Sequence, residues 1–238
     1  METARYAPGR AVDLFGNPAA PTVLLWHGTQ TDARATVRVL AGLLADRGMS
    51  VVAPDWDSHR ADGGRADLLE SVRYARSWSH SPEPLTLVGW SLGGVAAAGL
   101  TVHAQAHGVA LRHTVCLAGA FTARDPISGE EVTARLNAVA VRTPFTLLHG
   151  TADDVVPVSA SRTFAAALAN AGWPVRFCEL DADHGDIAGA RYDAAADRYA
   201  PADDPATRRT AGEVADHVAE AVRHGGLGGR EAGTDQQR

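Results

Sequence analysis

The fold is decided by residues 85–94, LTLVGWSLGG, in which an apolar run ends in a serine between glycines. The run predicts a buried strand, and the small apolar residues that follow it predict a helix. Gly89 and Gly93 carry no Cβ, so the backbone can reverse sharply between the two elements. Such a turn holds the side chain of Ser91 exposed at its apex.

The rest of the chain repeats the same alternation of short β-branched runs and longer stretches rich in Ala, Leu and Arg. Strands are expected at 11–15, 22–27, 50–54, 85–89, 113–118, 145–149 and 175–180. Helices are expected at 32–47, 65–80, 91–107, 130–139, 159–171 and 206–224, and Gly48 and Gly172 punctuate two helix ends. Several strands are apolar on both faces, which predicts an α/β fold with a mostly parallel central sheet and helices on both sides.

Composition narrows the class of protein. The chain has 238 residues, 45% of them hydrophobic, which suits one domain over residues 1–224. The polar, glycine-rich residues 225–238 are expected to form a disordered tail. A net charge of -6 without long basic runs argues against nucleic acid and membrane partners and favours a small molecule. No signal peptide or membrane span is evident, and two isolated cysteines form no disulfide framework, so a cytoplasmic protein is expected.

Reactive side chains follow four of the expected strands. One is Ser91, and the other three are the segments HGTQ at 27–30, HGTADDVVP at 149–157 and DADHGD at 181–186. Ligands bind beyond the carboxyl ends of parallel strands, so these segments are expected to meet at one edge of the sheet. Together they supply a nucleophile, a turn for binding an oxyanion, a carboxylate and an imidazole.

With these motifs, the chain resembles the α/β-hydrolases over roughly residues 10–224, and more closely the small serine esterases of the dienelactone hydrolase and carboxylesterase branch. The elbow G-x-S-x-G stands at 89–93, and the order Ser, Asp, His along the chain is the order of that family. Dienelactone hydrolases carry cysteine at the elbow, whereas this chain carries Ser91. The connection between the strands at 113–118 and 145–149 is too short for a large cap domain.

The expected nucleophile is Ser91, and the expected base is His184, because a serine hydroxyl needs a neighbouring base to take its proton. His59, which follows the strand at 50–54, is the rival base. His27 and His149 also end strands at the correct edge, but each is followed directly by glycine and is expected to shape its loop.

The carboxylate is drawn from the neighbouring pair Asp153 and Asp154. The family pattern HG-x-x-D-x-x-V-P assigns the role to Asp153, with Asp154 as the alternative and Asp125 as a remote third. The carboxylate orients the imidazole and stabilises the imidazolium without taking its proton.

Two backbone amides are expected to form the oxyanion hole. Leu92 follows the nucleophile at a helix N-terminus, and the family's H-G-x turn assigns the second amide to Thr29, with Gln30 as the alternative. Aromatic residues near the same edge are candidate substrate contacts: Trp56, Trp90 and Tyr192. The stretch 185–206 is expected to form a rim or a short helix beside the site.

These residues predict hydrolysis of small to medium carboxylic esters through an acyl-enzyme, with no metal and no organic cofactor. Two alternatives share the same residues. One is an acyltransferase or thioesterase of a biosynthetic pathway, in which another acceptor replaces water. The other is a binding protein that keeps the fold without catalysis.

Overall fold

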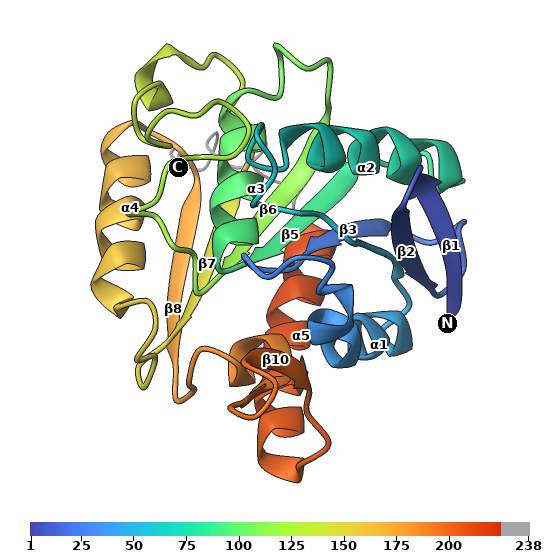
Figure 1. The fold of residues 1–238 in the computed structure, drawn as a ribbon. Coiled ribbons are helices and arrows are strands. Elements are labelled where there is room, and N and C mark those ends of the chain that lie inside the picture. Colours follow the sequence, from blue (N-terminus) through green and yellow to red (C-terminus); the bar gives the residue numbers. More distant parts are fainter. Residues whose placement is uncertain (225–238) are drawn as a thin grey trace, which may run out of the picture.

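The computed structural model describes residues 1–224, and the expected tail at 225–238 lies outside them. A central eight-stranded sheet has the order β1-β2-β4-β3-β5-β6-β7-β8, and a separate two-stranded sheet pairs β9 with β10 (Figure 1). Strands β3 to β8 run parallel to one another, whereas β1 and β2 are antiparallel to their neighbours. The prediction of a mostly parallel α/β sheet is confirmed.

The strands are β1 (Glu2–Ala7), β2 (Arg10–Phe15), β3 (Thr22–Trp26), β4 (Ser50–Pro54), β5 (Leu85–Trp90), β6 (Leu111–Leu117), β7 (Phe145–Gly150), β8 (Val175–Leu180), β9 (Ala190–Asp193) and β10 (Arg198–Pro201). The α-helices are α1 (Arg38–Asp46), α2 (Arg65–Trp78), α3 (Leu92–Val102), α4 (Val158–Asn170) and α5 (Pro205–His224). Three short 3-10 helices are η1 (Arg34–Val37), η2 (Leu136–Ala138) and η3 (Asp186–Ala188).

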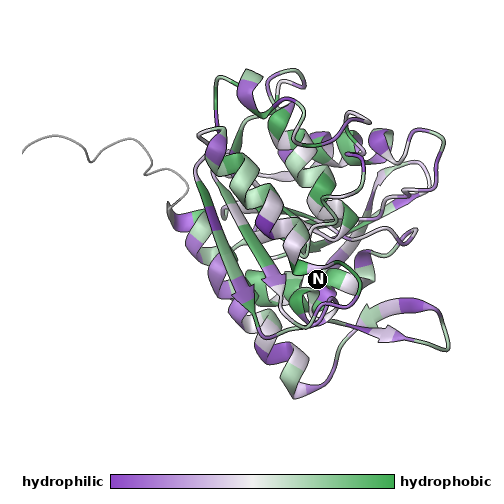
Figure 2. Cartoon of the chain, turned by 90° about the vertical axis from the view of Figure 1, so that its left-hand side faces the viewer, coloured by the Kyte–Doolittle hydropathy of each residue, from purple (hydrophilic) through white to green (hydrophobic). Residues whose placement is uncertain are grey.

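The apolar character of the central strands follows from helices on both sides of the sheet. In β3, Val23 and Leu25 point into a cluster with α1 and α5, while Leu24 and Trp26 point into a cluster with α2 and α3. A third cluster joins α3 and α4 to β7. Figure 2 shows the hydrophobic strands between helices whose outer faces are hydrophilic. All three clusters pack against the same eight-stranded sheet.

The helix expected at 130–139 is wrong. This segment lies between β6 and β7 and consists of turns, with only η2 as a regular element. Its amides bond three residues back, from Ala134 to Glu131 and from Leu136 to Thr133, and the Leu136 carbonyl accepts the Trp173 indole N–H at 3.0 Å. Most of the segment is exposed, so no continuous apolar face stabilises a helix there.

Two other parts of the fold differ from expectation. The edge strand β1 was not expected, because an edge strand exposed on one face carries few apolar residues. The stretch at 185–206, expected to form a rim or a short helix, contains the short helix η3 and, in addition, the β9–β10 hairpin, which was not expected. Gly48 and Gly172 have φ of 82° and 73° and close α1 and α4 as predicted.

Candidate active site

The turn between β5 and α3 holds Ser91 in a conformation that few residues adopt. Its φ is 57° and its ψ is -121°, a strained backbone of the kind that persists where the surrounding fold enforces it. A Cβ on Gly89 would lie 2.1 Å from the Gly93 carbonyl oxygen, and one on Gly93 would lie 2.2 Å from the His27 carbonyl oxygen. The Ser91 hydroxyl does not cap α3. Both glycines are therefore required sterically, and the serine has no capping role.

His184 and Asp153 meet beside this turn. The Nδ1 atom of His184 lies 2.7 Å from Oδ2 of Asp153, whose side chain has no exposed surface. The Trp90 indole donates a hydrogen bond of 2.8 Å to the His184 carbonyl oxygen, which fixes His184 next to the residue that precedes Ser91. Because Nδ1 faces a carboxylate, it carries the proton and leaves Nε2 as the basic nitrogen.

The carboxylate of Asp153 is held in its charged form. The Val155 and Val156 amides donate to Oδ1 at 2.9 and 2.8 Å. Burial by itself raises the pKa of Asp153, but hydrogen bonds from His149, His184 and the Val156 amide outweigh it and lower the pKa well below its usual range. A carboxylate that stays ionised orients the imidazole and balances the charge of an imidazolium.

His149 contacts the same carboxylate, which sequence reasoning missed. Its Nε2 lies 2.9 Å from the Val156 carbonyl oxygen and 3.3 Å from Oδ2 of Asp153, so Nε2 carries the proton. Its Nδ1 accepts from the Ser161 hydroxyl at 2.7 Å. The prediction that His149 shapes its loop captured only part of its contacts. The HG pair that follows β3 and recurs at the end of β7 is the one sequence signal that marks this position.

The alternative residues lie elsewhere. Asp154 is exposed, and no hydrogen bond joins it to His184 among the described residues. His59 has 68% of its side chain exposed and contacts Asp57 and Thr31. Asp125 accepts hydrogen bonds from Ile127 and Ser128 in its own turn. Of these candidates, the structure brings only Asp153 and His184 together.

The two amides expected to bind the oxyanion flank Ser91. Leu92 is the first residue of α3, and Thr29 lies in the turn after β3. A Cβ on the adjacent Gly28 would lie 3.2 Å from the Cβ of Ser91, so this turn approaches the serine closely. Within residues 1–224, neither amide donates a hydrogen bond to another residue. Both N–H groups are therefore without a protein acceptor in this part of the chain.

The three aromatic candidates have different environments. Trp56 is fully buried, stacks on His27 and donates to the His27 carbonyl oxygen at 3.1 Å. The expectation that Trp56 faces substrate is wrong, because its indole packs against His27 and has no exposed surface. Trp90 packs on the His184 ring at 5.0 Å between centroids, and Tyr192 is 52% exposed.

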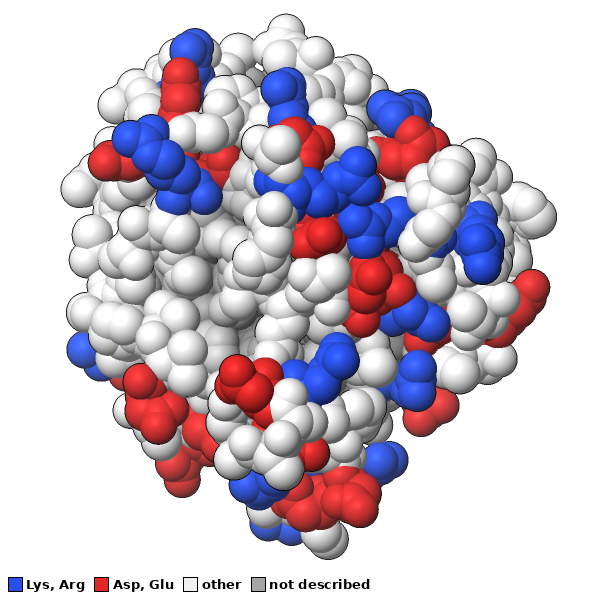
Figure 3. Space-filling model, viewed as in Figure 1, with Lys and Arg blue, Asp and Glu red and all other residues white. Residues whose placement is uncertain are grey.

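An uncharged groove of about 190 Å³ lies between the segment after β6 and the start of α4. Figure 3 shows a hollow beside α4 without Lys, Arg, Asp or Glu on its surface. The groove is lined by Phe121 and Thr122, close to Ala120, whose amide donates to the Ser91 carbonyl oxygen at 3.2 Å. Its other wall includes Pro157, which follows Val156 beside Asp153. The groove is thus formed by segments whose neighbouring residues contact the Ser91 backbone and the Asp153 carboxylate.

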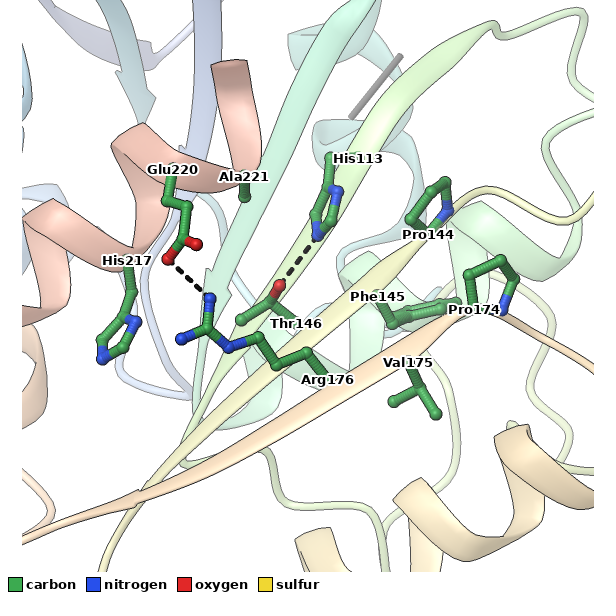
Figure 4. Close-up of a pocket in the computed structure, with 10 residues that line it drawn as sticks. All are labelled: His113, Pro144, Phe145, Thr146, Pro174, Val175, Arg176, His217, Glu220 and Ala221. Atoms are coloured by element: carbon green, nitrogen blue, oxygen red, sulfur yellow. Dashed lines mark hydrogen bonds and ion pairs between the residues drawn. The ribbon is translucent and has the colours of Figure 1, made fainter. Parts of the chain in front are cut away.

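A second pocket, of about 380 Å³, lies at the opposite edge of the sheet, where β6, β7 and β8 begin (Figure 4). His113 lies within hydrogen-bonding distance of Thr146, 2.9 Å away, and Arg176 pairs with Glu220 of α5 at 2.5 Å. Burial lowers the pKa of His113 to about 4. Among the described residues, no serine lines this pocket and no carboxylate contacts His113, so the pocket lacks the arrangement at the carboxyl edge.

Residues 1–224 contain neither a metal-binding cluster nor a membrane-spanning helix. No group of three or more His, Cys, Asp or Glu side chains is arranged to hold a metal ion there. In the same part of the chain, every helix is too short or too polar to cross a bilayer.

Comparison with known proteins gives one family and a set of similar folds. The sequence model of the family described as "Serine hydrolase (FSH1)" matches residues 48–185, which include the elbow, Asp153 and His184. No curated protein sequence matches the chain.

Solved esterases have the same fold. A thermophilic esterase from the Planctomycetes species Thermogutta terrifontis, Est2 with propionate bound, superposes with a TM-score of 0.67 at 19% identity, covering 93% of this chain and 94% of that one. The same esterase phosphorylated by paraoxon gives 0.65 at 20% identity, with 91% and 92% covered. A truncated carbohydrate esterase from gut microbiota gives 0.64 at 16% identity, with 94% and 97% covered.

Proposed function

The chain belongs to the serine hydrolase (FSH1) family, and from this premise we propose that it hydrolyses small, uncharged carboxylic esters through an acyl-enzyme. The observation that carries the proposal is the contact of 2.7 Å between His184 and the buried, ionised Asp153, beside a serine held in a strained turn. This arrangement combines a nucleophile with an oriented base and a charge that stabilises the base when it is protonated.

In the first step, Nε2 of His184 takes the hydroxyl proton of Ser91 while Oγ attacks the ester carbonyl carbon. The carbonyl oxygen becomes an oxyanion that accepts hydrogen bonds from the Leu92 and Thr29 amides. The imidazolium then gives its proton to the alkoxy oxygen, and the bond to the leaving alcohol breaks. The acyl group remains on Ser91.

In the second step, water replaces the alcohol. His184 takes a proton from water as its oxygen attacks the acyl carbon, and the same two amides hold the second oxyanion. The bond to Oγ breaks, the carboxylic acid leaves, and Ser91 regains a proton from His184. Asp153 stays ionised through both steps, in keeping with its lowered pKa.

The groove between the segment after β6 and α4 is the proposed acyl subsite. Its lining is uncharged and combines aromatic side chains with hydroxyls, which suits the acyl group of a neutral ester. Its volume of about 190 Å³ supports short to medium chains. The Est2 structures with propionate and with butyrate bound are in line with acyl groups of this size.

A fluorophosphonate probe tests the proposal directly. Wild-type protein is expected to form a covalent adduct on Ser91, seen by peptide mass spectrometry, and to release p-nitrophenol from acetyl and butyryl esters. Ser91→Ala is expected to do neither while remaining folded by circular dichroism. Labelling at another residue, or none in the folded wild-type protein, would refute the mechanism. Product analysis with and without an added alcohol or amine distinguishes hydrolysis from acyl transfer.

A further inference from the structure

The β9–β10 hairpin begins shortly after His184 and returns beside it. Tyr192 of β9 and Tyr199 of β10 are cross-strand partners, but their environments differ. Tyr192 is 52% exposed and its hydroxyl bonds Asp197 within the hairpin. Tyr199 is half-buried and lies over Gly185, where a Cβ would come within 3.0 Å of its ring. One tyrosine therefore faces solvent and the other faces the active site.

The Tyr199 ring completes a cluster of three rings around the base. Its centroid lies 5.1 Å from that of Trp90 in an edge-to-face arrangement and 5.9 Å from that of His184. Trp90 and His184 are 5.0 Å apart. The imidazole is thus restrained by a hydrogen bond to Asp153 at Nδ1 and by two aromatic rings. Aromatic packing of this kind fixes a ring's orientation as well as burying surface.

Gln30 attaches this hairpin to the loop after β3. Its side-chain oxygen accepts the Tyr199 amide N–H at 3.0 Å, and its side-chain nitrogen donates to the Asp197 carbonyl oxygen at 3.1 Å. The Thr36 hydroxyl donates to the Tyr199 carbonyl oxygen at 3.3 Å. Gln30 directly follows Thr29, the proposed oxyanion donor. One side chain thus connects the backbone that carries the Tyr199 ring to the turn that carries the oxyanion amide.

We propose that Gln30 and Tyr199 are positioning residues, which hold the His184 imidazole and the Thr29 amide in the relative geometry that the reaction needs. This inference rests on the proposed function. It assigns to the hairpin a role in positioning the reacting groups, in addition to the rim or short helix expected from the sequence. Displacing reacting groups by about 1 Å costs roughly a hundredfold in rate, so a tether across two loops has a measurable effect.

The ring of Tyr199, and not its hydroxyl, does the positioning. Within the described residues the hydroxyl has no hydrogen-bond partner. Burial, together with the carboxylates of Asp183, Asp153 and Asp154, raises the pKa of Tyr199 to about 12, so the phenol stays neutral near pH 7. Tyr199→Phe keeps every ring contact and both backbone hydrogen bonds, and it is the conservative variant of this position.

The experiment compares Tyr199→Ala, Tyr199→Phe and Gln30→Ala with wild type by two readouts. One is the second-order rate of fluorophosphonate labelling, which depends on an activated Ser91 and an oxyanion hole. The other is the separation of kcat from KM for p-nitrophenyl acetate. Tyr199→Ala and Gln30→Ala are expected to lower both the labelling rate and kcat by about ten- to a hundredfold, with KM within twofold. Tyr199→Phe is expected to retain both within twofold.

Matched controls come from the same two segments. Arg191→Ala removes an exposed ion pair to Asp204 from the hairpin, and Thr31→Ala removes exposed contacts next to Gln30; both are expected to behave as wild type. A raised KM with unchanged labelling would make Tyr199 a substrate contact and overturn the inference, as would wild-type rates in both alanine variants. If Tyr199→Ala does not fold, Gln30→Ala decides alone. Activity remaining in Ser91→Ala would instead refute the proposed function.

Discussion

The two edges of the sheet each hold a buried histidine, and the comparison shows what separates a reactive histidine from a structural one. His184, at the carboxyl edge, contacts the buried carboxylate of Asp153. His113, at the amino edge, interacts through Nε2 with Thr146, while its Nδ1 has no partner among the described residues. Burial lowers the pKa of His113 to about 4, so it stays neutral near pH 7. A carboxylate in contact with a buried imidazole stabilises its protonated form; Asp153 supplies one to His184, whereas within residues 1–224 no carboxylate contacts His113.

The largest expected effect is the loss of ester turnover when Ser91, at the carboxyl edge, is replaced by alanine. Without the nucleophile, kcat is expected to fall by about 10⁴ to 10⁶. At the amino edge, Thr146→Val is expected to leave kcat within twofold. Ester turnover is measured for both variants, with thermal melts to verify folding. Near-normal turnover in Ser91→Ala would remove Ser91 from the mechanism.

The neighbouring aspartates give the next largest effect. Asp153→Asn is expected to lower kcat by roughly 10⁴, because an amide in that position favours the wrong imidazole tautomer. Asp154→Asn is the matched control, since Asp154 is exposed, and it is expected to keep kcat within a fewfold of wild type. Stopped-flow or steady-state turnover of p-nitrophenyl acetate checks both. A larger loss in Asp154→Asn would transfer the role to that residue.

The rates for esters of different acyl-chain length test which of the two pockets binds the acyl group. Rates are expected to rise from acetyl to medium-chain esters and then to level off, with no jump when the substrate forms micelles. Ala160→Leu fills part of the groove beside α4 and is expected to lower kcat/KM for octanoyl relative to acetyl esters roughly tenfold, through loss of about two buried methylenes at ~0.8 kcal/mol each.

The control for that variant is Ala221→Leu, a similarly buried alanine in the pocket at the amino edge. It is expected to leave the selectivity unchanged. A shift in Ala221→Leu and none in Ala160→Leu would place the acyl chain at the wrong edge for the proposed mechanism. A steady rise in rate up to palmitoyl esters would show that the groove does not limit chain length.

The smallest expected effect is on stability against acid. Burial lowers the pKa of His113 to about 4 and that of His27 to about 3, whereas an unfolded histidine titrates near ~6.5. Between the folded and unfolded pKa values, the unfolded chain binds more protons than the folded chain. The contribution of these two histidines to the free energy of unfolding is therefore complete above pH ~6.5 and is lost as the pH falls through this range.

His113→Gln removes one of these groups and is expected to reduce the pH dependence of the unfolding free energy by up to about 1.4 kcal/mol per pH unit. Urea denaturation between pH 4.5 and 7 measures this slope. Equal slopes in wild type and variant would mean that His113 does not titrate differently in the folded and unfolded states. Ester turnover at pH 7 is expected to stay the same.

The sequence by itself determined the elements whose signals are local. Strands β4 and β8 were predicted with their observed bounds, because each is a short run that begins soon after a helix-ending glycine, Gly48 or Gly172. The elbow at 89–93 was predicted because the sharp turn at Ser91 leaves no room for a Cβ at Gly89 or Gly93. The sequence also predicted that Ser91, Asp153 and His184 lie near one another, because each follows a strand whose carboxyl end lies at the same edge of the sheet.

Tertiary structure decided what depends on contacts between distant segments. The sequence does not show that His149 shares the Asp153 carboxylate, that Trp56 is buried on His27, or that Gln30 holds the hairpin to the loop after β3. The sequence also predicted a helix at 130–139, but in the folded protein this segment has no continuous apolar face to pack against the core. Such outcomes depend on which surfaces meet when the sheet and its helices close around one core, and no local pattern in the chain encodes that geometry.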